Sequence, residues 1–321
     1  MDSPGPAPPS RSVAPYLATA FGLFLIWSNS FIAASYLLGS EARPQQLDWI
    51  SLSVLRFVLI APLCLAYCLL FRRHETLLIV RCYPGRLMVI GLLGVPGYNL
   101  ALYYGQQHGV PPPVASLTTA LLPLFVMVLA ALLLGERLTR RKVAAFGVAF
   151  SGLIVIALSK GDKRSVAGYG LVLGITALAP LSWSLYSILS KPIMGLRSPL
   201  VWTYMGIVVG SVPLYLLLPW YGGPQLRTLG IDGWLAVLYL SVLCTLIGYA
   251  VWTWLLRHLP ASTVGFTVFF NPPLTTISKM VLAAALPALF FFRVEPLELV
   301  GGGLALVGLA LAVWPTSRIA P

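Results

Sequence analysis

Ten stretches of about 20 mostly apolar residues, joined by short polar connections, constrain this chain more than any other feature. A helix of about 20 residues is long enough to cross the roughly 30 Å hydrocarbon core of a bilayer. The pattern therefore predicts ten membrane-spanning helices, at residues 15–38, 49–71, 87–107, 113–134, 143–159, 168–190, 199–219, 233–256, 264–286 and 297–315.

Composition points to the same fold class, an all-α integral membrane protein. Hydrophobic residues make up 58% of the 321 positions and charged residues only 9%, whereas soluble domains carry about 25% charged residues. A net charge of +12 would suggest nucleic-acid binding in a soluble protein. Here the Lys and Arg residues lie mostly between the apolar stretches, so we expect contact with membrane lipid and no nucleic-acid partner.

The basic residues also predict the orientation of the chain. The tails (1–14 and 316–321) and the even-numbered connections together carry about twice as many Lys and Arg residues as the odd-numbered connections. Because positive charge is enriched on the cytoplasmic side, both termini are expected in the cytoplasm. The Pro-rich N-terminal tail is expected to be disordered.

The two halves of the chain resemble each other. The clearest match sets Gly97-Tyr98 in the third stretch against Gly248-Tyr249 in the eighth, 151 residues later. Further matched pairs are Pro123 with Pro272-Pro273, Trp27-Ser28 with Trp183-Ser184, and Glu136 with Glu295.

Matching halves predict a five-helix repeat at 15–159 and a second at 168–315, joined by a loop at 160–167. Because five crossings are an odd number, the second copy must insert upside down. Inverted repeats of this kind underlie alternating access in many secondary transporters, with the substrate site near the midplane between the halves. The topology thus indicates a carrier of small molecules.

Several motifs resemble the EamA family of the drug/metabolite transporter superfamily, over nearly the whole chain after residue 15. They are Trp27-Ser28-Asn29-Ser30-Phe31, Arg56, Leu134-Gly135-Glu136-Arg137-Leu138-Thr139, Gly147 with Gly152, and Ser182-Trp183-Ser184 with Tyr186. The resemblance implies a ten-helix fold in the bacterial inner membrane and outward transport of amino acids. The aromatic-rich third and eighth stretches are most similar to exporters of aromatic amino acids within that family.

Arg56 is the clearest candidate for contact with a substrate. A charge within a span costs about 2.5–3.5 kcal/mol on insertion scales, so it marks a functional position. Arg56 lies inside the second stretch, where it could attract a substrate carboxylate. It could instead pair with backbone carbonyls, or reach the membrane interface through its long side chain.

The ninth stretch departs from the family pattern. Glu295 follows Glu136 by 159 residues rather than 151, so extra residues lie after the proline pair. Prolines can break a helix and expose polar backbone to a cavity, and Asn271 beside them could bind a ligand there. A kink needed only for packing is the alternative. Lys279, later in the same stretch, is a candidate for gating or coupling.

Aromatic residues form the remaining candidates for substrate binding. Trp183 with Tyr186, and Tyr249 with Trp252, are each three residues apart and so share a helix face. If these faces meet between the halves, they form a cavity suited to amphipathic substrates; aromatic belts at the membrane interface are the alternative. The predicted aromatic lining, with one neighbouring amide, is Tyr98, Asn99, Trp183, Tyr186, Tyr249 and Trp252.

Carboxylates are missing from the middle of every predicted span. Because buried carboxylates are common proton relays, their absence favours a facilitator that moves its substrate down the substrate's own gradient. Glu136, at the end of the fourth stretch beside Arg137 and Arg140, is expected to cap or gate a cytoplasmic end.

Other functions find little support. The chain has no metal-binding His pair and no Gly-x-Ser-x-Gly motif, and Cys64 and Cys68 have no His nearby. We therefore expect no enzyme activity, metal or cofactor. A drug or metabolite antiporter of another substrate class stays an alternative, as does a membrane scaffold or sensor. The oligomeric state is open, with a monomer as the simplest case.

Overall fold

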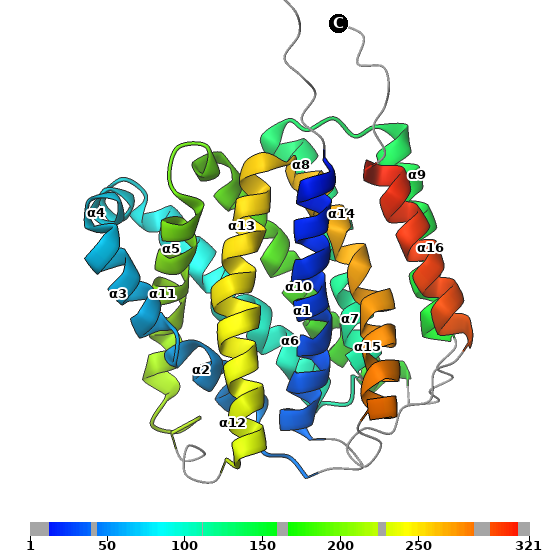
Figure 1. The fold of residues 1–321 in the computed structure, drawn as a ribbon, viewed down its shortest axis with the longest axis horizontal. Coiled ribbons are helices and arrows are strands. Elements are labelled where there is room, and N and C mark those ends of the chain that lie inside the picture. Colours follow the sequence, from blue (N-terminus) through cyan, green and yellow to red (C-terminus); the bar gives the residue numbers. More distant parts are fainter. Residues whose placement is uncertain are drawn as a thin grey trace, which may run out of the picture.

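The computed structural model describes residues 13–39, 44–110, 112–158, 166–223, 229–285 and 296–313. Over these ranges the chain forms ten helical crossings (Figure 1). They are α1 (Ala14–Leu38); α2 and α3 (Trp49–Val58, Ala61–Phe71); α5, η1 and α6 (Pro84–Leu92, Leu93–Gly97, Tyr98–Gln107); α7 and α8 (Pro112–Thr119, Leu122–Leu134); α9 (Arg140–Leu158); α10 (Val166–Met194); α11 (Pro199–Leu217); α12, η3 and α13 (Ile231–Leu238, Tyr239–Ile247, Gly248–His258); α14, η4 and α15 (Ala261–Phe266, Thr267–Phe270, Asn271–Ala285); and α16 (Pro296–Val313).

The predicted all-α membrane fold is confirmed. Among the described residues, six crossings are long and apolar enough to span a bilayer, and residues 122–134 and 299–313 form shorter apolar helices. Most of the predicted N-terminal tail, residues 160–165 of the predicted loop and the whole C-terminal tail lie outside the described residues.

One helix was not predicted. α4 (Arg73–Cys82) lies between the second and third crossings and buries Thr76 and Ile79 on one face. The Thr76 hydroxyl donates to the carbonyl of Cys68 at 3.0 Å, which ties α4 back to α3. A search for apolar stretches misses such a helix because charged residues occupy its exposed face.

The packing of the helices follows the two-fold relation between the halves. α10, the first helix of the second half, packs against α6 and α8. α1, the first helix of the first half, packs against their counterparts α13 and α15. α9 and α16, which end the two halves, pack against each other at one edge of the molecule (Figure 1).

The third and eighth crossings are irregular at matching places. Each contains a π-helical segment at the Gly-Tyr pair of the repeat: η1 ends at Gly97, and η3 ends at Ile247, directly before Gly248. The wider π turn changes which backbone carbonyls are available to side chains, and such segments occur often at functional sites. Tyr249 donates to the carbonyl of Gly94 in η1 at 2.9 Å, and Trp27 donates to that of Cys244 in η3 at 2.9 Å. The two halves are thus joined at both irregular segments.

Candidate functional site

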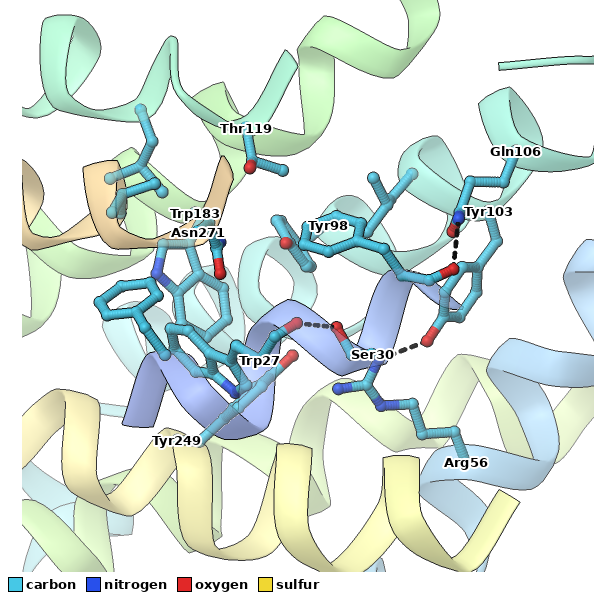
Figure 2. Close-up of a pocket in the computed structure, with 15 residues that line it drawn as sticks. Trp27, Ser30, Arg56, Tyr98, Tyr103, Gln106, Thr119, Trp183, Tyr249 and Asn271 are labelled. Carbon is cyan, nitrogen blue, oxygen red and sulfur yellow. Dashed lines mark hydrogen bonds between the residues drawn. The ribbon is translucent and has the colours of Figure 1, made fainter. Parts of the chain in front are cut away.

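A cavity lies between the two halves, at the level of the irregular segments (Figure 2). Its volume is about 40 Å³, and one water molecule needs about 10–15 Å³ of such volume. The cavity therefore has room for a few water molecules in this conformation. The lining residues are Phe24, Trp27, Ser30, Phe31, Arg56, Tyr98, Leu102, Tyr103, Gln106, Thr119, Leu122, Trp183, Tyr249, Val268 and Asn271.

Aromatic rings from both halves meet at this cavity. The ring centroid of Trp183 lies 5.6 Å from that of its repeat partner Trp27, 5.1 Å from Tyr98 and 4.6 Å from Tyr249. Aromatic pairs at these separations attract one another beyond the area that they bury. The predicted meeting of aromatic faces between the halves is thus present in the structure.

Arg56 supplies the positive charge of the cavity. Its side chain is 4% exposed, and its Nε donates to the Thr245 hydroxyl at 2.7 Å. Its Nη1 donates to Asn99 Oδ1 at 3.0 Å and to the Tyr103 hydroxyl. All three acceptors are neutral, and in the described part of the chain no carboxylate lies within ion-pairing distance of Arg56.

Asn99 supports Arg56 from behind the cavity. Its Nδ2 donates to the Val95 carbonyl at 2.9 Å and to the Tyr249 hydroxyl at 3.1 Å. These bonds fix the amide so that its oxygen points to the guanidinium. Asn99 therefore links Arg56, η1 and the eighth crossing in one network.

Two buried amide oxygens at the cavity have no hydrogen-bond partner among the described residues. They are Gln106 Oε1 and Asn271 Oδ1. Buried polar atoms are nearly always paired with protein groups or ordered water, so unpaired acceptors in a cavity indicate a place where water or a ligand donates. Figure 2 shows Gln106 on the side of Arg56 and Tyr103, and Asn271 on the side of Trp27 and Trp183.

The predicted binding residues fall into two layers. Arg56, Tyr98, Trp183, Tyr249 and Asn271 line the cavity. The other three lie behind them: Asn99 holds Arg56, Tyr186 packs on Trp183 with ring centroids 4.9 Å apart, and Trp252 donates to the Ser187 hydroxyl at 2.9 Å.

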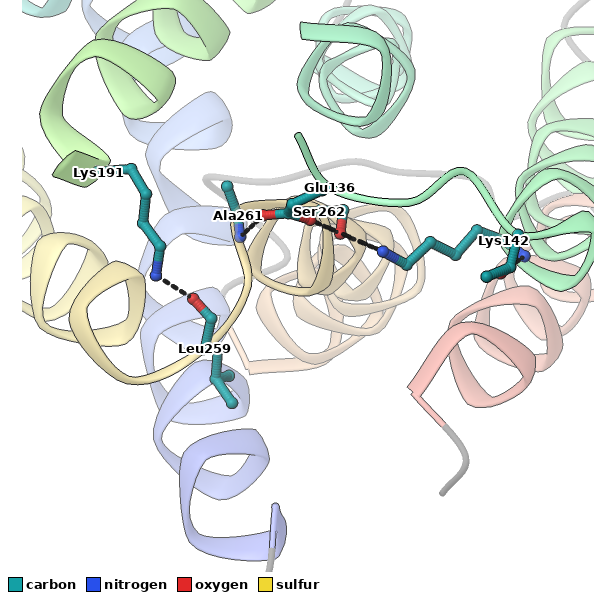
Figure 3. Close-up of polar contacts among 7 residues, drawn as sticks. Glu136, Lys142, Lys191, Leu259, Ala261 and Ser262 are labelled. Carbon is teal, nitrogen blue, oxygen red and sulfur yellow. Dashed lines mark hydrogen bonds and ion pairs between the residues drawn. The ribbon is translucent and has the colours of Figure 1, made fainter. Parts of the chain in front are cut away.

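The two residues predicted to gate or couple lie away from the cavity. Lys279 is buried within α15 and is not part of the lining. Glu136 lies in the connection after α8 and accepts from the backbone N–H groups of Ala261 and Ser262 at 2.7 and 3.3 Å, and from the Ser262 hydroxyl (Figure 3). It thus caps the start of the ninth crossing, where a negative charge is favourable.

Two lysines add further contacts around the cap formed by Glu136. Lys142 forms an ion pair with Glu136 at 3.7 Å. Lys191 of α10 donates to the carbonyls of Leu256 and Leu259, at the end of α13. The corner between α13 and α14 is therefore held by charged groups from α9, α10 and the connection after α8 (Figure 3).

Sequence reasoning missed several lining residues, above all Trp27, Tyr103 and Gln106. The repeat did contain a signal for Trp27, because Trp27-Ser28 matches Trp183-Ser184. Tyr103 lies four residues after Asn99 and so shares its helix face. No sequence signal identified Gln106. Among the described residues, no group of three or more His, Cys, Asp or Glu side chains could hold a metal ion.

Comparison with known proteins identifies the family. The model of the EamA-like transporter family matches residues 20–158 and again residues 169–314. An uncharacterized transporter of Archaeoglobus fulgidus is 30% identical over 233 residues, which cover 71% of this chain and 77% of that protein. A crystal structure with 22% identity and a TM-score of 0.72 covers 94% of this chain and 97% of its own, which shows the shared fold.

Two further relatives have names that describe a cargo. A probable terminal-alkyne amino-acid exporter of Streptantibioticus cattleyicolor is 30% identical, over 69% of this chain and 70% of that protein. A probable amino-acid metabolite efflux pump of Salmonella typhimurium is 27% identical, over 68% and 75%. Since the family model matches most of its length in two copies, the chain belongs to the EamA-like transporter family and is a membrane transporter, not an enzyme.

Proposed function

We propose that this transporter exports amino acids with aromatic or other large apolar side chains, by alternating access through the central cavity. The observation that carries the proposal is Arg56, a buried cation at the cavity whose described partners are all neutral. A buried charge without a counter-ion is costly. A substrate carboxylate would offset that cost and form strong, charge-assisted hydrogen bonds with the guanidinium.

The walls of the cavity support a substrate with an apolar body. Trp27, Tyr98, Trp183 and Tyr249 surround the space beside Arg56 (Figure 2). Flat aromatic surfaces bind apolar side chains by burying their area, and ring faces also attract an ammonium group. The names of the Streptantibioticus and Salmonella relatives support amino acids as the cargo.

Alternating access is supported by the size of the cavity. A space of about 40 Å³ is too small for an amino acid, so the helices around it must separate before a substrate enters. The inverted halves supply two alternative packings for such a movement. The cap formed by Glu136 is proposed to close one end of the path, and Lys279 is proposed to affect coupling through the ninth crossing.

The lining favours facilitated transport. None of the described lining residues is Asp or Glu, and carboxylates are the usual proton relays of coupled carriers. A proton-coupled antiporter, including one for another class of metabolite or drug, is the competing function.

We propose the orientation of the chain in the membrane from the distribution of its basic residues. The start of α1 and the end of α16 lie at the same end of the molecule, together with α4 and the connection after α8 (Figure 1). Five arginines lie in or directly beside α4 and the connection after α8: Arg72, Arg73, Arg81, Arg137 and Arg140. On the positive-inside rule, we propose that this end faces the cytoplasm and that the protein lies in a bacterial inner membrane.

Flux measurements in liposomes that contain the purified chain test the proposal. We expect counterflow of labelled L-phenylalanine, with inhibition by aromatic and large aliphatic amino acids and little by glycine or glutamate. Under an imposed pH gradient, labelled phenylalanine should equilibrate and not accumulate. Accumulation would show a proton antiporter, and no movement of any amino acid would overturn the proposed substrate class.

A further inference from the structure

The side-chain amide of Gln106 forms a hydrogen bond through its nitrogen but, among the described residues, none through its oxygen. Its Nε2 donates to the carbonyl of Phe31 in α1 at 3.0 Å, whereas its Oε1 is buried without a partner in the described part of the chain. The bond to Phe31 fixes which end of the amide is the oxygen, because a carbonyl accepts only from N–H. The side chain is 7% exposed and lines the cavity (Figure 2).

The position of Gln106 on α6 places it next to the partners of Arg56. Asn99, Tyr103 and Gln106 follow one another at helical spacing and lie on one buried face. Asn99 and Tyr103 both accept hydrogen bonds from Arg56. Gln106, one turn beyond Tyr103, continues this face as an acceptor that Arg56 does not use.

The chemistry of this pair matches a zwitterion. An ammonium group has three donors and no acceptor, and an unpaired buried oxygen gains most from a charged donor. In an α-amino acid the carboxylate and the ammonium are attached to the same carbon, so both must be bound close together. A cation and an unpaired acceptor on adjacent surfaces fit that arrangement.

We propose that Gln106 Oε1 binds the α-ammonium group of a substrate whose carboxylate is held by Arg56. This inference rests on the proposed function and narrows it: the site selects α-amino acids over carboxylic acids of the same shape. The other unpaired acceptor, Asn271 Oδ1, lies on the opposite side of the cavity, by Trp27 and Trp183 and away from Arg56 (Figure 2).

Binding of three matched ligands tests the inference. The full chain in lipid nanodiscs is titrated with L-phenylalanine, with 3-phenylpropionate, which lacks the ammonium, and with 2-phenylethylamine, which lacks the carboxylate. Ligand-induced stabilisation against unfolding reports each affinity. The wild type should bind phenylalanine on the order of tenfold more tightly than 3-phenylpropionate, as a hydrogen bond to a charged group predicts.

Gln106→Met keeps the volume of the side chain and removes the acceptor. It should weaken the binding of phenylalanine and leave the binding of 3-phenylpropionate nearly unchanged, so the ratio of the two affinities falls to about one. If Gln106 has only a structural role, the substitution will weaken the binding of both ligands alike and preserve the ratio. That result would overturn the inference. The control is Gln107→Met, since Gln107 accepts from the backbone of Trp49 at 2.7 Å and lies outside the lining; it should keep the wild-type ratio.

The three ligands separate this inference from the proposed function. Equal binding of phenylalanine and 3-phenylpropionate by the wild type refutes the role of Gln106 while the carboxylate site at Arg56 stands. If 2-phenylethylamine binds as tightly as phenylalanine, or if no ligand binds, the proposed function fails and the inference fails with it.

Discussion

At the residue scale, Trp183 joins the aromatic walls of the cavity. Besides Trp27, Tyr98 and Tyr249, its ring lies 4.9 Å from that of Tyr186 and 5.8 Å from that of Trp252. The rings of Tyr186 and Trp252 do not line the cavity, so in the proposed site they would act through the lining rings that they contact. Arg56 is organised in the same way, with Asn99 behind it.

Replacing Trp183 by alanine should lower the affinity for aromatic amino acids by at least tenfold. The substitution removes a wall of the cavity and leaves its aromatic neighbours unsupported; large-to-small changes at buried aromatic residues cost about 3–5 kcal/mol of stability. Counterflow, normalised to the amount of protein in the membrane, measures the effect. Trp183→Phe should retain part of the activity.

Trp220→Ala serves as the matched control, because Trp220 is 69% exposed on the surface of the protein. It should transport at the wild-type rate. A wild-type rate and affinity in Trp183→Ala would remove this ring from the substrate site.

Arg56 and the aromatic residues predicted to line the cavity each have one of two properties that are visible in the sequence. Arg56 is a charge inside an apolar stretch, and Tyr98, Trp183 and Tyr249 belong to motifs that the repeat duplicates. Gln106 has neither property. Its proposed role rests on an unpaired oxygen beside the Arg56 network, and hydrogen bonding between helices cannot be read from the spacing of residues within one helix.

At the element scale, the start of the ninth crossing is held by charges. Glu136 caps α14, and Lys191 binds the last carbonyls of α13. Both charges have the sign that the adjoining helix end favours. In the proposed mechanism the halves separate at this end, which would require the bonds of Glu136 to α14 to break and re-form in each transport cycle.

Glu136→Gln should therefore slow transport several-fold while binding affinity in the cavity changes little. The variant keeps one neutral amide oxygen for the cap and loses the negative charge, the second acceptor oxygen and the ion pair, and cap substitutions cost about 1 kcal/mol. This weakens the closed form of one end. Initial rates of flux, together with equilibrium binding, separate the two effects.

Lys142→Met is the comparison for this variant. It removes the ion pair and the hydrogen bond from Lys142 to the Ser262 hydroxyl but leaves Glu136 on the cap, and a partly exposed pair contributes about 0–1 kcal/mol. Lys142→Met should therefore lower the transport rate less than Glu136→Gln does. Unchanged flux in Glu136→Gln, or equal losses in both variants, would contradict a gating role for the cap.

The elements also show what the sequence leaves open. Hydropathy predicted the ten crossings because apolar length is the property that a bilayer selects. It missed α4, whose polar face carries Arg73 and Arg81. It also missed the π segments η1 and η3. η1 contains Pro96 whereas η3 contains no proline, so proline is not a sequence signal shared by the two segments.

At the scale of the whole molecule, two inverted halves enclose one cavity whose chemistry is not symmetric. The repeat contributes the paired rings, Trp27 with Trp183 and Tyr98 with Tyr249. Arg56 and Gln106 belong to the first half and Asn271 to the second. In the proposed mechanism the symmetry would supply the alternating movement, and the asymmetric polar groups would orient the substrate within it.

The central claim is that Arg56 binds the substrate carboxylate in this cavity. The most direct test is the affinity of L-phenylalanine relative to L-phenylalaninamide, whose carboxylate is replaced by a neutral amide, in the wild type and in Arg56→Met. We predict that the wild type prefers the amino acid by at least thirtyfold, since loss of one partner of a buried charge pair costs about 2–5 kcal/mol, and that Arg56→Met loses this preference. Equal affinities in the wild type, or an undiminished preference in Arg56→Met, would contradict the claim.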